Sequence, residues 1–158
     1  MSRKVIRDIF MKNIIKLFIV AVVAAPMLIS CGIIAPKSFQ RAVDGGSWSS
    51  VMVREDLSYD RAFGEVMDVI GRRFELDMIS KDGGYLRTNW IYTWNKKGKY
   101  TTKYRTRIVI KFSSDKRRID IKSEAEFGGE PRWVKGFDTA LLTQTKQDIM
   151  GVVGTTVL

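Results

Sequence analysis

The sequence contains no histidine and a single cysteine, Cys31. One cysteine excludes an internal disulfide and any zinc or iron–sulfur site built from several cysteines. The absence of histidine removes the most common general base and the most common metal ligand, and it excludes every Ser/His/Asp or Cys/His arrangement. No phosphate-binding glycine loop or calcium loop is present, because Gly83-Gly84 lies between two predicted strands. We therefore expect a protein that is not an enzyme and has no cofactor.

Long apolar runs are also scarce, and the one that stands out is Leu17–Ile29. It follows Lys12 and Lys16, and it is shorter than the roughly 20 residues that a membrane-spanning helix needs. A basic flank before a short apolar stretch is typical of a secretory signal. Met11 opens a signal of more usual proportions, so translation can start at Met1 or at Met11.

The apolar run ends in Leu28-Ile29-Ser30-Cys31, which resembles the lipobox of bacterial lipoproteins. The resemblance implies that Leu28, Ile29 and Ser30 are recognised by signal peptidase II. It also implies that Cys31 becomes the first mature residue and carries diacylglycerol and an N-acyl chain. Two or three acyl chains hold a protein durably on a membrane. The alternative is that Cys31 is an ordinary buried thiol. Gly32, in place of an aspartate, points by resemblance to the outer membrane rather than the inner one.

Basic residues outnumber acidic ones, 27 to 17. Five basic residues and one acidic residue precede Cys31, so the remainder has 22 basic and 16 acidic residues and a net charge of +6. Such a charge attracts anionic lipid or glycolipid surfaces and nucleic acid. Export makes a nucleic-acid partner unsuitable, so we expect none.

The pattern after Cys31 predicts a tether and one folded domain. Residues 31–47 contain Pro36, Gly45 and Gly46 without a sustained period, which indicates a flexible tether before a domain at 48–158. Within the domain, apolar stripes predict a helix after Ser58 that ends near Gly71, and a second helix over about 138–152. Alternating residues predict strands over 49–54, 74–80, 85–94, 101–112 and 118–127, with 128–136 as a loop. The expected fold is α+β: an antiparallel sheet of four to five strands with two helices on one face, in the order β-α-β-β-β-β-α.

One predicted strand, 85–94, is unusually aromatic and precedes a basic strand. If Leu86, Trp90 and Trp94 point inward, Arg87 and Asn89 point outward beside Arg105 and Arg107. This outward face is either an ordinary solvated surface or a docking surface for a protein or an anionic glycolipid. Trp133 is a further candidate anchor, or else a lid on the core. The candidate partner surface is therefore Arg87, Asn89, Arg105, Arg107 and Trp133.

The mature part of the chain also resembles the small α/β domains of outer-membrane lipoproteins such as BamC, which assist β-barrel assembly. The residues that carry this resemblance are Tyr59–Arg72, Gly83–Trp90, Arg105-x-Arg107 and the last helix, within about 48–153. BamC has two such domains, and this chain has room for one. The resemblance implies a lipid-anchored, periplasm-facing protein that supports envelope assembly through protein contacts. The alternative is a glycolipid- or lipopolysaccharide-binding module. A cell-wall hydrolase would need a pair of carboxylates lining a cleft, which the sequence does not supply.

Overall fold

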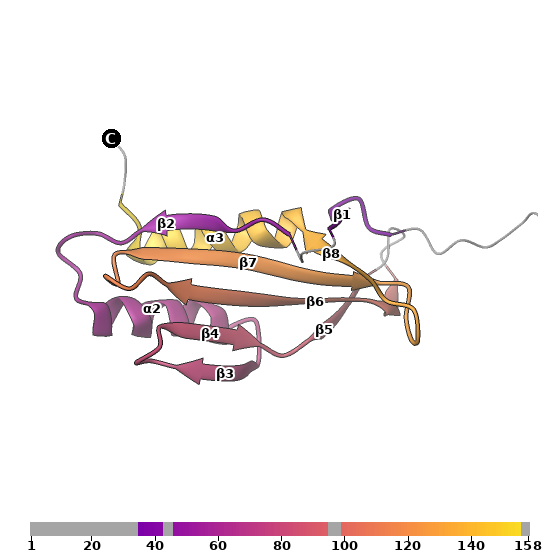
Figure 1. The fold of residues 1–158 in the computed structure, drawn as a ribbon, viewed down its shortest axis with the longest axis horizontal. Coiled ribbons are helices and arrows are strands. Elements are labelled where there is room, and N and C mark those ends of the chain that lie inside the picture. Colours follow the sequence, from indigo (N-terminus) through magenta and orange to yellow (C-terminus); the bar gives the residue numbers. More distant parts are fainter. Residues whose placement is uncertain (1–34, 43–45, 95–98, 156–158) are drawn as a thin grey trace, which may run out of the picture. The chain divides into compact units, whose positions relative to one another are not determined.

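The structure is a computed structural model that describes residues 35–42, 46–94 and 99–155. This part of the chain forms eight strands and two helices (Figure 1). The strands are β1 (Phe39–Arg41), β2 (Ser49–Met52), β3 (Leu76–Ser80), β4 (Tyr85–Thr88), β5 (Ile91–Trp94), β6 (Tyr100–Phe112), β7 (Arg118–Phe127) and β8 (Val134–Asp138). The helices are α2 (Tyr59–Gly71) and α3 (Thr139–Val153). None of the helices in this part is long and apolar enough to cross a membrane. The predicted signal and lipobox, including Leu28, Ile29, Ser30 and Cys31, lie outside the described residues.

All strands join one antiparallel sheet, so the predicted α+β class is confirmed. The predicted count of four to five strands was too low. The long strands β6 and β7 pair along nine residues, and each is flanked on its outer side by two short strands. β5 and β4 share the outer side of β6, while β8 and β2 share that of β7. The strand path is β1-β8-β7-β6-β4-β3.

Both helices cover one face of the sheet. α2 begins where the Ser58 hydroxyl accepts the amide N–H of Arg61, and α3 begins where the Asp138 carboxylate accepts that of Leu141. The buried residues of the two helices form one cluster with the inward residues of β2, β4, β6 and β7. In Figure 1 the strands β2 and β7 pass in front of α3, so the opposite face of the sheet carries neither of the two helices of the described residues. We call that helix-free side the open face.

Two buried hydroxyl groups stabilise the gaps between the short strands. Between β4 and β5, Thr88 Oγ1 accepts the backbone N–H of Ile108 at 3.0 Å. Between β2 and β8, Ser123 Oγ donates to the carbonyl of Asp138 at 2.7 Å and accepts its N–H at 3.1 Å. Each hydroxyl thus satisfies backbone groups that would otherwise be buried without partners. The sheet tolerates broken flanking strands for this reason.

The break after β4 corrects one predicted strand. Residues 85–94 form two strands, and the alternation shifts by one residue between Thr88 and Ile91. Leu86 and Thr88 are buried on the core side, but Ile91 pairs with inward-facing Thr106 and packs against the core. Trp90 therefore lies on the open face, not in the core as predicted. On β3 a bulge after Leu76 similarly places Met78 outside the core, with 44% of its surface exposed.

The first and last short strands correct two further predictions. The predicted loop 128–136 contains the start of β8, and β1 lies inside the predicted tether 31–47. Phe39 pairs with Asp138 and Arg41 with Gly136, and the amide of Ala42 donates to the Lys135 carbonyl at 3.2 Å. The ordered domain therefore begins before the predicted boundary at residue 48.

Replacing Gly136 with alanine should detach β1, because the added Cβ would lie 2.1 Å from the Gln40 carbonyl oxygen and 2.7 Å from the Phe39 ring. We expect a loss of about 1–3 kcal/mol in the free energy of unfolding and faster hydrogen exchange at the amide of Ala42. Gly151→Ala is the control, since its Cβ would meet nothing within 4 Å and alanine favours a helix interior. Unchanged exchange at Ala42 in Gly136→Ala would show that β1 is not held as described.

Candidate functional site

The open face carries a cluster of arginine, tryptophan and glutamate side chains from four segments. Arg105 and Arg107 lie two residues apart on β6, so both point away from the core. Glu126 and Glu124 occupy the directly opposite positions on β7. Trp90 comes from the break between β4 and β5, and Trp133 precedes β8. We call Trp90, Arg105, Arg107, Glu124, Glu126 and Trp133 the Trp–Arg cluster.

The two arginines are held from several sides. The Arg105 guanidinium lies 4.8 Å from the ring centre of Trp90 and 4.3 Å from that of Trp133, so it sits against both rings. The Arg107 guanidinium lies 4.4 Å from the ring centre of Trp90. Each arginine also reaches its glutamate at 2.6 Å. Cation–π contacts of this kind contribute about 0.5–2 kcal/mol each. Each arginine of the cluster thus has both an aromatic and a carboxylate contact.

Charges within the cluster are compensated. Burial lowers the pKa of Arg105, but the hydrogen bond and charge of Glu126, together with Tyr92, outweigh this effect and raise the pKa overall. About a fifth of each arginine side chain is exposed. Further along β7, Lys122 pairs with Glu124 at 3.4 Å, and its ammonium lies 5.6 Å from the ring centre of Trp48. The Trp–Arg cluster thus offers aromatic rings and two arginines that are already paired with two glutamates.

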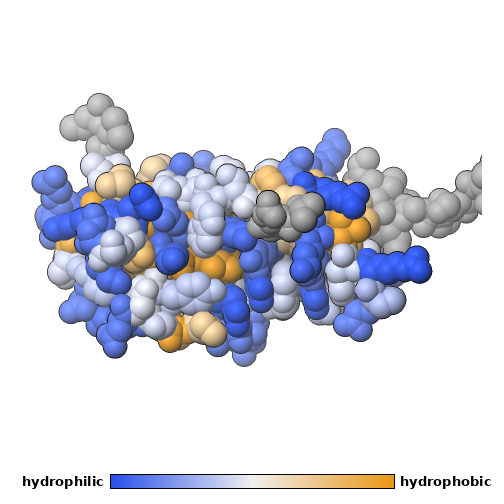
Figure 2. Space-filling view, viewed as in Figure 1, coloured by the Kyte–Doolittle hydropathy of each residue, from blue (hydrophilic) through white to orange (hydrophobic). Residues whose placement is uncertain are grey.

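Aromatic side chains extend the cluster toward solvent. Trp48 is 46% exposed and Tyr92, which pairs with Arg105 in the sheet register, is 40% exposed. Figure 2 shows this side of the molecule, on which hydrophilic residues predominate. Half-exposed aromatic rings beside arginine are the composition found at the energetic centres of protein interfaces.

Three of the five predicted surface residues, Arg105, Arg107 and Trp133, come together in the cluster. Arg87 lies on the same face but nearer the β3 edge, where it binds Asp77 at 2.6 Å. Asn89 lies in the strand break, and its backbone N–H donates to the Glu75 carbonyl at 2.8 Å. Trp90 and Trp48 were not predicted. The alternation of inward and outward residues shifts after Thr88, and this shift is what places Trp90 on the open face. Nothing in the sequence indicates that Trp48 lies beside β7.

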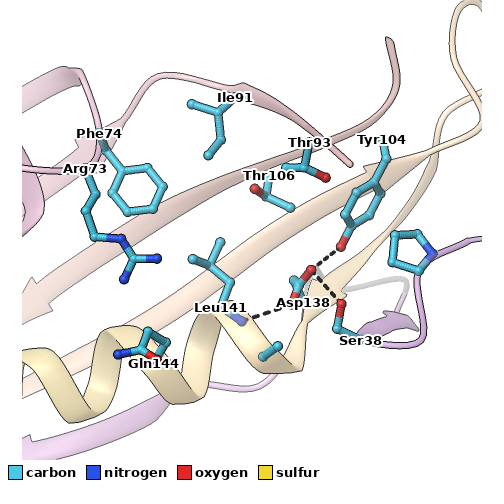
Figure 3. A pocket seen from close by; sticks show the side chains of 12 residues that line it. Ser38, Arg73, Phe74, Ile91, Thr93, Tyr104, Thr106, Asp138, Leu141 and Gln144 are labelled. Carbon is cyan, nitrogen blue, oxygen red and sulfur yellow. Dashed lines mark hydrogen bonds between the residues drawn. The ribbon is translucent and has the colours of Figure 1, made fainter. Parts of the chain in front are cut away.

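A cavity of about 500 Å³ lies on the core side of the sheet, next to the start of α3 (Figure 3). The Asp138 carboxylate at its edge accepts hydrogen bonds from Tyr104 Oη at 2.5 Å, Ser38 Oγ at 2.9 Å and the Leu141 amide at 3.0 Å. Burial, with the adjacent Asp138 carboxylate, raises the pKa of Tyr104 well above its usual range, so its hydroxyl remains a donor. Asp138 thus joins β1, β6 and α3, and its oxygens are occupied by structural contacts. Among the described residues, no three metal-ligating side chains gather.

The free energy of unfolding should decrease in acid as Asp120 is protonated. Burial raises the pKa of this carboxyl group, but the hydrogen bonds from Ser50 and Arg118 and the charges of Arg118 and Lys111 lower it overall. A carboxylate with a lowered pKa stabilises the fold above its unfolded pKa of about 3.9, and that stability is lost as the pH falls through the folded value. Urea denaturation below pH of about 4 should show a shallower pH dependence in Asp120→Asn than in the wild type. Equal slopes would contradict this role.

No protein-family model matches the chain, and no curated protein is significantly similar to it. The function is therefore argued from the chemistry of the open face.

Proposed function

We propose that this chain is a lipid-anchored, non-enzymatic envelope protein that binds a partner protein through the Trp–Arg cluster. The lipid is carried by Cys31, and the domain faces the periplasm from the outer membrane. In this role it supports the assembly of envelope or outer-membrane proteins. The observation that carries the docking role is the contact of Arg105 with both Trp90 and Trp133, on the sheet face that neither α2 nor α3 covers.

Three properties of the cluster support a protein partner. Tryptophan and arginine are enriched among residues that dominate binding energy. The arginines are fixed by Glu124 and Glu126 before any partner arrives, so little side-chain entropy is lost on binding. The compensated charges also suit an interface that excludes water without leaving a charge unpaired.

The alternative partner, an anionic glycolipid, requires cationic groups that can meet phosphate. Arg105 and Arg107 are engaged by glutamates and Arg87 by Asp77, so phosphate would have to displace carboxylates at 2.6 Å. The glycolipid is therefore the competing outcome of the test rather than a second proposal.

Site-specific photocrosslinking in cells tests the proposal. A photoreactive residue at Tyr92, on the open face, should give one or a few discrete protein adducts. The same residue at Gln147, which is exposed on α3, should give none and serves as the control. Adducts to lipopolysaccharide at Tyr92 would instead favour the glycolipid module. Equal adducts at both positions, or none at either, would contradict a docking role for the open face.

A further inference from the structure

The start of the ordered domain lies only a few residues after the predicted lipid-bearing cysteine. Pro36 is the fifth residue after Cys31, and the chain turns there because the amide of Phe39 donates to the Pro36 carbonyl at 3.1 Å. A fully extended chain spans at most about 3.6 Å per residue, so Pro36 lies within roughly 18 Å of Cys31. The thirteen residues of β6 are longer than this, at about 43 Å. The short segment from Cys31 to Pro36 therefore limits how far the part of the domain next to Pro36 can lie from the bilayer that holds the lipid.

Pro36 belongs to one half of the domain. It lines the cavity with Tyr104 and Thr93, from the first half of β6 and from β5. β1 then runs toward the end of the sheet at which β6 begins and β7 meets β8: the Ala42 amide donates to the Lys135 carbonyl. We call this end of the sheet the anchor end.

Cations predominate at the anchor end. Lys103, Arg132 and Lys135 are exposed there, and the backbone places them together. The Gly128 amide donates to the Lys103 carbonyl at 2.9 Å, and the Arg132 amide donates to the Gly129 carbonyl at 2.9 Å. Lys37 and Arg41 on the incoming chain are exposed as well. Glu130 is the exposed acidic residue of the β7–β8 loop in the described part of the chain.

The opposite end of the sheet differs in charge. There Arg118 binds Asp120 at 2.9 Å, Lys116 donates to the Asp82 carbonyl at 3.2 Å, and Arg117 donates to the carbonyl of Glu55 at 3.3 Å. These three cations are thus engaged within the protein. The anchor end also contains Tyr100, a residue that is 59% exposed, and tyrosine is enriched at the level of lipid headgroups.

We propose that the anchor end, with Lys103, Arg132 and Lys135, lies against anionic lipid headgroups of the bilayer that holds Cys31. This proposal rests on the lipid anchor of the proposed function. Basic residues near an anionic membrane are attracted over about one screening length. The bound domain is then held at this end, with the opposite end of the sheet farther from the bilayer.

The distance from each end of the sheet to the lipid headgroups can be compared on the full, lipidated chain in vesicles. Cys31 is the single cysteine, so an added cysteine is the one free thiol once Cys31 carries lipid. Thr102→Cys at the anchor end and Ser114→Cys at the opposite end are matched exposed positions that leave every cation in place. Each is labelled with a fluorophore, and quenching by headgroup-labelled lipid is compared in vesicles with and without phosphatidylglycerol.

We expect strong quenching at Thr102→Cys in anionic vesicles and little at Ser114→Cys. The difference in quenching between the two positions should be lost in neutral vesicles and at 1 M salt, where the screening length falls to about 3 Å. The protein should stay bound under both conditions. Charge reversal of Lys103, Arg132 and Lys135 to glutamate should abolish the difference in quenching. Charge reversal of Arg61, Arg72 and Lys146 to glutamate should leave it unchanged.

The two proposals fail in different ways. Vesicle-bound protein with equal quenching at both positions overturns the orientation and leaves the lipid anchor intact. Protein that does not stay on vesicles, or that labels at Cys31, overturns the anchor and the orientation with it.

Discussion

Asp138→Ala is expected to lower the free energy of unfolding by about 3–5 kcal/mol. The substitution removes the N-cap of α3 and the acceptor for the buried hydroxyl of Tyr104, which is 2% exposed. It also releases Ser38, so β1 loses a contact to the rest of the domain. Urea denaturation at neutral pH measures the change.

Two variants separate these contributions. Ser58→Ala removes the exposed N-cap of α2 and should cost about 1 kcal/mol, because only a capping bond is lost. Tyr104→Phe keeps the cap of α3 and removes one hydrogen bond. Its loss in the free energy of unfolding should therefore lie between those of Ser58→Ala and Asp138→Ala. If Asp138→Ala cost no more than Ser58→Ala, Asp138 would be a simple cap and not the junction of β1, β6 and α3.

Trp90→Ala should weaken binding of the partner captured at Tyr92 by about 30-fold, which corresponds to about 2 kcal/mol. Trp90 is the ring that both Arg105 and Arg107 contact, so its removal takes one aromatic contact from each guanidinium group. The measurement is a binding titration of the purified partner against the wild type and the variant. A thermal unfolding curve for each protein shows whether the variant remains folded.

Ile79→Ala is the matched control for this binding experiment. Ile79 is 52% exposed, but it pairs with buried Leu86 and therefore lies on the helix side of the sheet. Its truncation removes exposed apolar surface without touching the open face, so affinity should not change. Equal affinities for Trp90→Ala and Ile79→Ala would show that the Trp–Arg cluster does not bind the partner.

The parts of the fold that the sequence predicted correctly have strong local signals. The helix after Ser58 has a capping residue and an apolar stripe, and its predicted start and end agree with α2. The alternation in β6 and β7 predicted their inward residues, such as Ile108 and Ile121, which are fully buried. In both cases one face of the element is apolar along its whole length, which fixes the face that packs.

The strands that were missed are short, and non-local contacts specify them. β1 has three residues, too few for a period, and it is held by pairing with β8 about a hundred residues later. β8 contains Gly136, a loop signal in sequence, but the missing side chain is what allows the Gln40 carbonyl to approach. Local patterns cannot reveal either requirement.

The candidate surface was also predicted only in part, because local patterns place some of its residues and non-local contacts place the others. Arg105 and Arg107 share one strand, so their common face follows from alternation alone. The position of Trp90 depends on the break after β4, which Thr88 makes possible by accepting the Ile108 N–H. The pairing of the arginines with glutamates on β7 depends on register, and it changes the surface from a basic face to a compensated one.

The lipid on Cys31 is the claim on which both the proposed function and the orientation at the membrane depend. Intact-mass spectrometry of the protein extracted from membranes tests it most directly. We expect a mature chain that begins at Cys31 and carries diacylglycerol on sulfur, with an acyl chain on the amino group. An unmodified thiol at Cys31, or a chain that retains the residues before it, would contradict the lipid anchor.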